Sequence, residues 1–205
     1  MKKGLFITFE GADGCGKTTQ INLLADYLTS KGYRVIVTRE PGAKGLGEKI
    51  REILLNYDGE VSDKCESFLF LADRAQHVDV MIKPAIENGQ IVLCDRYTDS
   101  TVAYQGYGRM QDLSRINMLN DIATNSLKPD LTFVFDIDVE TSQKRVGAEK
   151  DRMESAGIEF HNRVRNGYLE LARKEPGRIK IIDASKTIEN IHQQVVSYIN
   201  AAFAN

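Results

Sequence analysis

An eight-residue stretch near the start of the sequence combines glycines, a lysine and a threonine at spacings that suit phosphate binding. Residues 11–18 read GADGCGKT and match the P-loop pattern GxxxxGK[ST] at every specified position. Glycines let the loop curl so that backbone N–H groups face a phosphate, and the following helix adds the positive end of its dipole. Lys17 can reach the β- and γ-phosphates, and the Thr18 hydroxyl can bind Mg²⁺. The predicted nucleotide-binding residues are Gly11, Ala12, Asp13, Gly14, Cys15, Gly16, Lys17, Thr18 and Thr19.

Charged residues also follow the ends of later apolar runs. Arg39 comes after the second run, and Asp95 and Arg96 come at the end of the third. Ligands of open parallel sheets bind beyond the carboxyl ends of the strands, so we expect Arg39, Arg96 and Lys17 to converge on one crevice. Such a group of cations brings two phosphate-bearing substrates together. Asp95 is the preferred partner of the metal ion, and Asp136, which also ends a run, is its rival.

The P-loop by itself leaves the class of protein open. A GTP-dependent switch usually carries a guanine-reading NKxD motif after a later strand, and the sequence has none. A motor ATPase usually ends a strand with Asp-Glu, in which the glutamate activates water. Here Asp95 is followed by Arg96, which suits phosphate binding instead. The sequence therefore favours a small-molecule kinase. The alternatives are another P-loop nucleoside or nucleotide kinase and, more distantly, a GTP-binding switch.

The elements that must position these residues are read from the spacing of apolar side chains. Short runs rich in β-branched and aromatic residues predict buried parallel strands, and longer segments with helical periodicity lie between them. The predicted strands cover residues 5–9, 33–38, 90–94, 131–136 and 178–182, and the predicted helices cover 18–31, 66–87, 114–127, 162–174 and 188–203. This alternation indicates an α/β protein of the P-loop NTPase fold, a five-stranded parallel sheet with helices on both faces. Residues 1–205 are predicted to form a single domain, with a mobile polar flap near residues 147–159.

Composition excludes several other classes of protein. The net charge is −2, from 27 basic and 29 acidic residues, and broad nucleic-acid binding needs a surplus of basic residues. The sequence contains no apolar run long enough to span a bilayer. The three cysteines are widely spaced, which is typical of a reducing compartment, and the three histidines are expected to be ordinary surface or partly buried residues. We therefore expect a cytoplasmic protein with no nucleic-acid or membrane partner.

Five short motifs, in order, make the sequence resemble the thymidylate kinases over nearly the whole chain. They are FEG at 9–11, REPG at 39–42, FLADR at 70–74, DRY at 95–97 and STVAYQG at 100–106. The resemblance implies a nucleoside monophosphate kinase that transfers the γ-phosphoryl group of ATP to dTMP, giving dTDP and ADP, with Mg²⁺ as cofactor. The expected metal ligands are Thr18 and Asp95.

The resemblance also implies roles for the acceptor-side residues. Arg39 holds the acceptor phosphate, and Pro41 follows a peptide bond that is often cis. The ring of Phe70 stacks on thymine, as aromatic side chains do on bases, and Arg74 donates to a thymine oxygen. Tyr104 lies under the deoxyribose and crowds out a 2′-hydroxyl group. The full expected acceptor set is Asp13, Arg39, Phe70, Arg74, Arg96, Ser100, Thr101, Tyr104 and Gln105. From the residues alone, Phe70 and Tyr104 would instead be read as core.

The family divides by the source of one catalytic cation. The eukaryotic type has an arginine inside the P-loop, where this chain has Gly14, and the common bacterial type supplies the cation from the flap. Residues 151–154 read DRME and match the bacterial flap pattern. The resemblance therefore implies Arg152 as a catalytic residue with Lys17, Asp95 and Arg96. Lys144, Arg145 and Lys150 lie nearby, and Arg145 is the next candidate. Such kinases are commonly homodimers.

Overall fold

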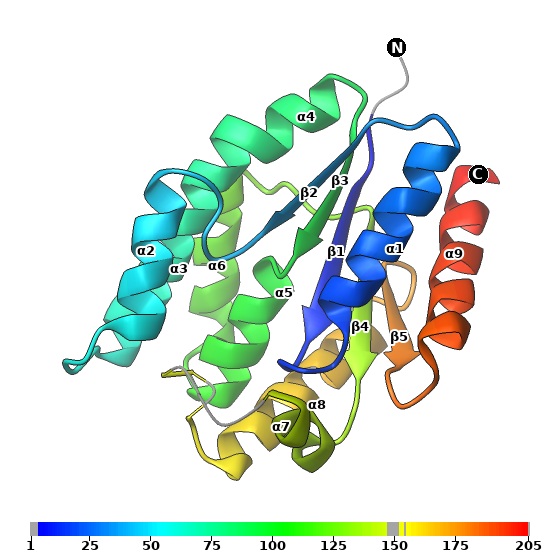
Figure 1. Cartoon of the computed structure of the whole chain (residues 1–205). Coiled ribbons are helices and arrows are strands. Elements are labelled where there is room, and N and C mark those ends of the chain that lie inside the picture. The colour runs from blue at the N-terminus through cyan, green and yellow to red at the C-terminus, as the bar shows by residue number, and fades with distance from the viewer. Residues whose placement is uncertain (1–3, 147–151, 154, 205) are drawn as a thin grey trace.

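A parallel β-sheet forms the centre of the molecule in the computed structural model, which describes residues 4–146, 152–153 and 155–204 (Figure 1). The sheet has five strands in the order β2-β3-β1-β4-β5. Their bounds are β1 Phe6–Gly11, β2 Val35–Arg39, β3 Ile91–Asp95, β4 Leu131–Asp136 and β5 Ile179–Asp183. Every adjacent pair runs parallel, so all the carboxyl ends meet at one edge of the sheet.

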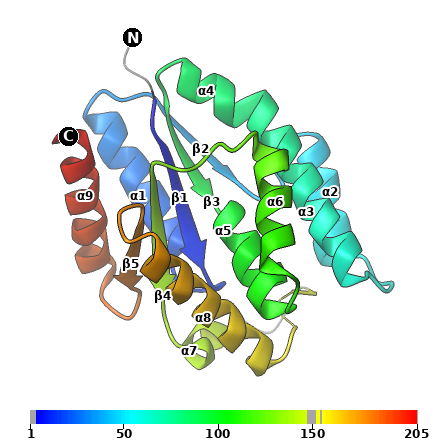
Figure 2. The ribbon, with the colours of Figure 1, turned by 180° about the vertical axis from the view of Figure 1, so that it is seen from behind.

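Helices cover both faces of the sheet. Helices α1 (Lys17–Ser30) and α9 (Ile188–Ala204) lie in front of it in Figure 1 and behind it in Figure 2. Their apolar side chains pack on the sheet in one buried cluster, with Leu24, Val195 and Phe133 as members. The opposite face carries α8 (Ile158–Lys174) and the short α5 (Thr98–Thr101). This arrangement confirms the predicted α/β fold with helices on both faces.

The remaining helices differ from the sequence-based expectation in their detail. The predicted helix at 66–87 is interrupted by a π-helical turn: α3 (Asp63–His77) leads into η1 (Val78–Ile82) and α4 (Lys83–Glu87). A second π-helical segment, η2 (Val102–Gly108), continues α5. Helix α6 spans Leu113–Thr124. Helices α2 (Leu46–Asn56) and α7 (Val139–Val146) were not predicted.

Helix α2 was missed although its apolar residues stand at helical spacing: Ile50 and Leu54 are buried, while Leu46 and Ile53 are about half exposed. Within the described part of the chain, no helix is both long enough and apolar enough to cross a membrane. Residues 147–151 and 154 of the predicted flap lie outside the described residues, so its mobility stays a prediction.

Candidate active site

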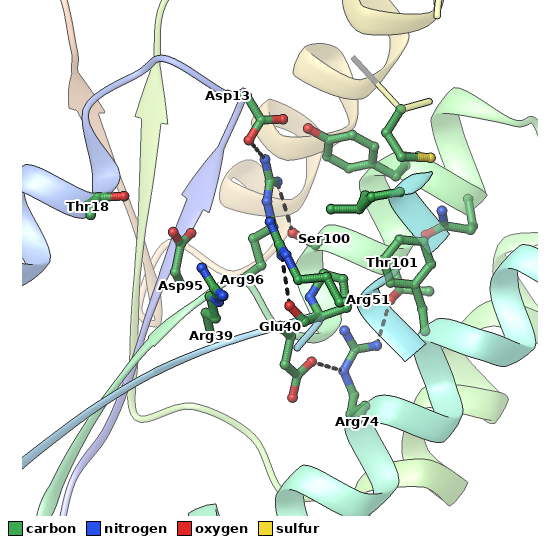
Figure 3. Close-up of a pocket in the computed structure, with 16 residues that line it drawn as sticks. Asp13, Thr18, Arg39, Glu40, Arg51, Arg74, Asp95, Arg96, Ser100 and Thr101 are labelled. Atoms are coloured by element: carbon green, nitrogen blue, oxygen red, sulfur yellow. Dashed lines mark hydrogen bonds and ion pairs between the residues drawn. The ribbon is translucent and has the colours of Figure 1, made fainter. Parts of the chain in front are cut away.

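A cavity of about 250 Å³ opens beyond the carboxyl ends of β1, β2 and β3 (Figure 3). Its lining contains every residue predicted to bind the acceptor, namely Asp13, Arg39, Phe70, Arg74, Arg96, Ser100, Thr101, Tyr104 and Gln105. Thr18 and Asp95, the predicted metal ligands, line it as well. Asp13 and Gln105 share this space although they are 92 positions apart, because the P-loop and the ends of β2 and β3 meet α3, α5 and η2 at this edge of the sheet.

The P-loop joins β1 to α1 in a conformation that only glycine adopts easily. Gly14 and Gly16 have φ angles of 75° and 93°, and a Cβ atom at Gly14 would lie 2.8 Å from the carbonyl oxygen of Ser142. Lys17 is buried, and its ammonium group donates to the carbonyl oxygens of Gly11 and Ala12 at 3.2 and 2.9 Å. The loop therefore holds the Lys17 ammonium group at the N-terminal end of α1, where the helix dipole also favours an anion.

Asp95 has the properties of a metal ligand. Its Oδ1 atom is buried without a hydrogen-bond partner among the described residues and lies 4.0 Å from Nζ of Lys17. A buried carboxylate oxygen with no donor is costly unless a cation or water satisfies it. Thr18 supplies a hydroxyl group at the same cavity, so the oxygen donors fit Mg²⁺. Asp136 differs, because Arg165 binds both of its oxygens at 2.6 and 3.0 Å.

Two arginines face the cavity in different ways. Arg39 ends β2 with an exposed side chain and has no ion pair within the described ranges. Arg96 follows β3 with a φ angle of 70°, a left-handed turn that is uncommon for a bulky residue. Its guanidinium donates to Asp13 at 2.7 Å and lies 5.0 Å from the centre of the Tyr104 ring.

Asp13 is charged in this arrangement. Burial raises its pKa, but Arg96 and Lys17 outweigh that effect and lower the pKa to about 2.

The opposite end of the cavity is more apolar. Phe70 is only half-buried and belongs to none of the clusters of buried hydrophobic residues found in the described ranges. Tyr104 lines the cavity but is 7 % exposed and packs with Phe160 and Tyr168, so it is a core residue as well. A half-buried phenyl ring on a cavity wall suits contact with a planar ligand, which argues against the interpretation of Phe70 as core.

Arg74 is buried and bound on most sides (Figure 3). Its Nε atom donates to Glu40 at 2.8 Å, Nη1 donates to Thr101 and Asn120 at 2.6 and 2.9 Å, and Nη2 donates to the carbonyl oxygen of Tyr97 at 2.8 Å. Arginine has five N–H groups, so the described residues use four and leave one on Nη2. The residue therefore joins α3, α5 and the loop after β2, and only this last N–H group is left for a ligand.

Comparisons with known proteins agree with this geometry. A family model described as thymidylate kinase matches residues 9–195. The chain belongs to the thymidylate kinase family. A thymidylate kinase of Sulfurihydrogenibium is 51% identical over 194 residues, covering 94% of this chain and 95% of the relative. One of Desulfovibrio desulfuricans is 47% identical over 207 residues, covering 96% and 95%.

A solved structure gives the same result for the fold. The crystal structure of the thymidylate kinase from Ehrlichia chaffeensis superposes with a TM-score of 0.79 at 38% identity, covering 97% of this chain and 99% of that one. The chain is therefore a phosphotransferase of the thymidylate kinase family, and the resemblance inferred from its five motifs is confirmed.

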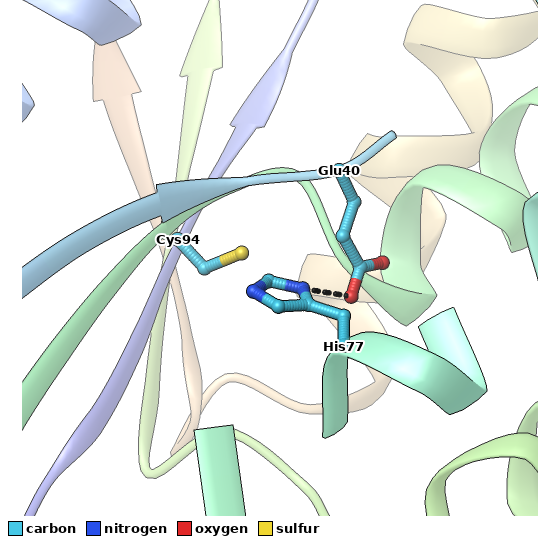
Figure 4. Close-up of side chains that lie close together, drawn as sticks. All are labelled: Glu40, His77 and Cys94. Carbon is cyan, nitrogen blue, oxygen red and sulfur yellow. Dashed lines mark hydrogen bonds and ion pairs between the residues drawn. The ribbon is translucent and has the colours of Figure 1, made fainter. Parts of the chain in front are cut away.

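Three buried side chains near the end of β2 form a cluster that sequence reasoning missed in this thymidylate kinase family member (Figure 4). Ligand atoms of Glu40, His77 and Cys94 lie within 4.8 Å of one another. However, His77 donates or accepts at both ring nitrogens, 2.9 Å from Glu40 and 2.8 Å from Thr38. Burial raises the pKa of Cys94 well above its ordinary value, which keeps it a thiol. The Cys94 thiol donates to the carbonyl oxygen of Arg96, so it is His77 that supports Glu40 and, through it, Arg74.

His77 also corrects an expectation from the sequence. It is 1% exposed, not a surface residue, because α3 turns it toward the end of β2. The Glu40–Pro41 peptide bond, just after β2, is cis, as the resemblance implies.

Glu10 of the FEG motif had no assigned role, and the structure places it beneath the site. Its carboxylate accepts from the Ser100 hydroxyl at 2.5 Å, from the Tyr168 hydroxyl at 3.0 Å and from the backbone N–H of Tyr97 at 2.8 Å. Burial and the nearby Asp99 raise its pKa to about 7. Glu10 therefore fixes the start of α5, which carries the Ser100 and Thr101 side chains to the cavity.

The two candidate cations, Arg152 of the flap and Arg145 of α7, occupy different places. Arg152 donates to Glu66 of α3 at 2.6 Å and to the carbonyl oxygen of Leu54 at 3.0 Å, and it is not among the residues that line the cavity. Arg145 is exposed on α7, and its Cβ lies 3.1 Å from the position of a Cβ on P-loop Gly14. The neighbouring Lys150 and the flap-motif residues Asp151 and Glu154 lie outside the described residues.

Sequence reasoning also missed some of the cavity wall. Arg51, Leu55 and Met153 line the cavity, and Arg51 donates to the carbonyl oxygen of Pro41 at 2.9 Å. Arg51 and Leu55 belong to α2, which was not predicted, so their four-residue spacing was the available signal. Cys15 and Thr19 of the predicted nucleotide-binding set differ in burial: the Cys15 side chain is in the core, and Thr19 is exposed.

Proposed function

We propose that this chain transfers the γ-phosphoryl group of ATP to dTMP, giving dTDP and ADP. The observation that carries the proposal is the continuity of one cavity. It joins the metal-side residues Thr18 and Asp95 to a half-buried phenyl ring at Phe70, with Arg39 and Arg96 between them. A phosphate bound between these arginines places its oxygen near the γ-phosphate of a nucleotide on the P-loop.

The acceptor would be held at both ends. Arg39 and Arg96 bind its phosphate, and Phe70 stacks on its base while Arg74 offers its remaining N–H group to a base oxygen. Ser100, Thr101, Tyr104 and Gln105 complete the sugar and base side, and Asp13 holds Arg96 in place. An acceptor without a phosphate would leave Arg39 with no anion to bind, which favours a monophosphate over a nucleoside.

Phosphoryl transfer then needs positive charge around the transferred group. An oxygen of the dTMP phosphate attacks the γ-phosphorus as the bond from that phosphorus to the β–γ bridging oxygen breaks, and the electron pair remains on ADP. Lys17 and the backbone N–H groups of the P-loop stabilise the developing charge. Thr18 and Asp95 would hold Mg²⁺, which neutralises phosphate charge when bound.

The flap would supply a further cation. We propose Arg152 for this role, with Arg145 as the rival. Arg152 has to leave Glu66 to reach the P-loop, whereas Arg145 already lies beside Gly14. Closure of such a segment also excludes water, which limits hydrolysis of ATP.

A panel of acceptors tests the proposed reaction. Purified protein with ATP and Mg²⁺ is assayed with dTMP, dUMP, thymidine and the other nucleoside monophosphates, and ADP formation is followed. We expect dTMP to be the best acceptor, dUMP to be weaker and thymidine to be inert. Thymidine turnover equal to that of dTMP would make the protein a nucleoside kinase. Phosphate release from GTP without an acceptor would favour the switch.

A homodimer and a cytoplasmic location complete the proposal. Helices α3 and α6 pack side by side and expose large apolar side chains, among them Phe68, Met118 and Ile122. Exposed apolar patches of this kind mark interaction surfaces, and a second copy of the chain is the occupant that we propose. All three cysteines are free thiols, which supports a reducing compartment.

A further inference from the structure

Glu66 carries a buried carboxylate that none of the proposed catalytic steps uses. Its side chain is 0% exposed, on the first turn of α3. Oε1 accepts from Nε2 of Gln105 at 3.0 Å and from Nε of Arg109 at 3.3 Å. Oε2 accepts from Nη2 of Arg109 at 3.1 Å and from Nη1 of Arg152 at 2.6 Å. One carboxylate therefore joins three side chains from two segments, because Gln105 lies in η2, Arg109 directly follows η2 and Arg152 belongs to the flap.

The charge of Glu66 depends on these partners. Burial by itself raises the pKa of a carboxyl group, but the hydrogen bonds from Arg109, Gln105 and Arg152 leave the pKa of Glu66 below its ordinary value. The carboxylate is therefore ionised. A buried, ionised carboxylate is costly without donors, so Arg109 and Gln105 would keep Glu66 paired when Arg152 leaves it.

The partners of Glu66 either line the acceptor cavity or are next to residues that line it. Gln105 lines that cavity, and so does Met153, the residue next to Arg152. The backbone N–H of Arg152 also lies 3.4 Å from the carbonyl oxygen of Leu55, another lining residue. Phe70 is one helical turn beyond Glu66 on α3, on the same side of the helix. Glu66 is therefore fixed behind the wall that the base would contact, without lining the cavity itself.

We propose that Glu66 is a positioning residue that holds Gln105 in place in the base-side wall of the acceptor cavity, with Arg109 as its lasting ion-pair partner and Arg152 as a partner only until the flap closes. The identity of the acceptor rests on the proposed function, whereas the positioning role of Glu66 rests on the contacts described above. Loss of the negative charge would break the ion pair with Arg109 and weaken the hydrogen bond from Gln105. The acceptor would then bind more weakly, while the nucleotide on the P-loop would be unaffected.

Steady-state kinetics of Glu66→Gln test this role. We expect the KM for dTMP to rise by about tenfold, the order expected when hydrogen bonds to a charged group are lost, while the KM for ATP stays within about twofold. Glu52→Gln is the matched control, because Glu52 is an exposed glutamate on the neighbouring α2. An unchanged KM for dTMP in folded E66Q would overturn the proposal, and so would an equal rise in both KM values.

A second variant keeps the test decisive if E66Q does not fold. Arg109→Lys retains the positive charge but loses the paired contact from Nε and Nη2. We expect it to raise the KM for dTMP in the same way, and a KM equal to that of the wild type overturns the proposal. Turnover of dTMP by the wild type tests the proposed function separately. If another monophosphate proves to be the best acceptor, the same KM ratios are measured with it.

Discussion

The half-buried ring of Phe70 shows at the scale of one residue how burial separates binding from folding. The ring lines the cavity and takes no part in the clusters of buried hydrophobic residues within the described ranges. The next residue, Leu71, is 6% exposed and packs inside. Truncation of Phe70 to alanine is therefore expected to affect binding, whereas truncation of Leu71 is expected to affect folding.

Phe70→Ala is expected to weaken acceptor binding and to leave the fold nearly intact. Loss of base stacking costs about 1–3 kcal/mol, so the KM for dTMP rises by roughly 5- to 150-fold while the KM for ATP is unchanged. Leu71→Ala is the control and is expected to lose about 2–5 kcal/mol of folding stability instead. Kinetics and thermal melting measure both variants. A large fall in the Tm of F70A with a normal KM for dTMP would show that Phe70 is a core residue.

Asp95→Asn is expected to lower kcat without unfolding the protein. Oδ1 of Asp95 has no hydrogen-bond partner among the described residues, so the change removes charge and no native hydrogen bond at that atom. The measurement is kcat against Mg²⁺ concentration, with Asp136→Asn as the comparison. That second variant breaks the ion pair with Arg165 and is expected to lower the Tm while retaining the Mg²⁺ dependence. Unchanged Mg²⁺ dependence in D95N would move the metal role to Asp136 or Asp13.

The sequence predicted the residues that belong to motifs better than those that support them. Arg39, Phe70 and Arg74 stand in motifs, and all of them line the cavity. The bonds of Arg74 to Glu40 and Asn120 could not be read, because they join positions 34 and 46 residues away. Such contacts are set by how the elements pack, and no local pattern carries that information.

At the scale of elements, the segment after β3 changes its winding where the site needs it. Helix α5 continues into the π-helical η2, in which the N–H of Arg109 donates to the carbonyl oxygen of Tyr104, five residues back, at 2.8 Å. The periodicity of an α-helix does not predict this turn, since a π-helix is rare and holds an extra residue per turn. The same limit explains why the helix predicted at 66–87 missed η1.

The flap and α7 compete for one catalytic role. If Arg152 leaves Glu66 to meet the transferring phosphoryl group, Arg152→Ala lowers kcat and kcat/KM together, by about 10³-fold, as for other arginine fingers. Arg145→Ala then changes kcat little. Single-turnover and steady-state kinetics of the two variants distinguish the cations. Near-normal kcat in R152A, with a large loss in R145A, would assign the role to the arginine beside the P-loop.

At the scale of the whole molecule, the alternation of strands and helices was enough to predict one α/β fold, but not its outer surface. The apolar residues of the strands indicate that the sheet is buried, whereas an interface between copies depends on which apolar side chains stay exposed after folding. Ile122 on α6 is 68% exposed, and Phe68 on the adjacent α3 is 52% exposed. These side chains appear in the sequence as part of ordinary amphipathic helices.

Ile122→Glu is expected to dissociate the proposed homodimer. A charge on the apolar face disfavours contact with a second copy, because it would be buried without a partner. Ile188→Glu is the control, since Ile188 is 52% exposed at the start of α9, on the other face of the sheet. Sedimentation velocity is expected to give twice the chain mass for the wild type and for I188E, and the chain mass for I122E. A wild type that sediments as a monomer would contradict the dimer.

The bonding of Arg74 has a consequence for inhibitor design. A compound that takes the last N–H group of this guanidinium binds a side chain that also holds Glu40, Thr101 and Asn120 together. Replacement of Arg74 would leave Glu40 as a buried carboxylate without its charged partner, at a cost of about 3–5 kcal/mol. That is a large share of the stability of a domain of this size. Mutation of Arg74 to escape such a compound would therefore yield an unstable enzyme, so resistance through this residue is disfavoured.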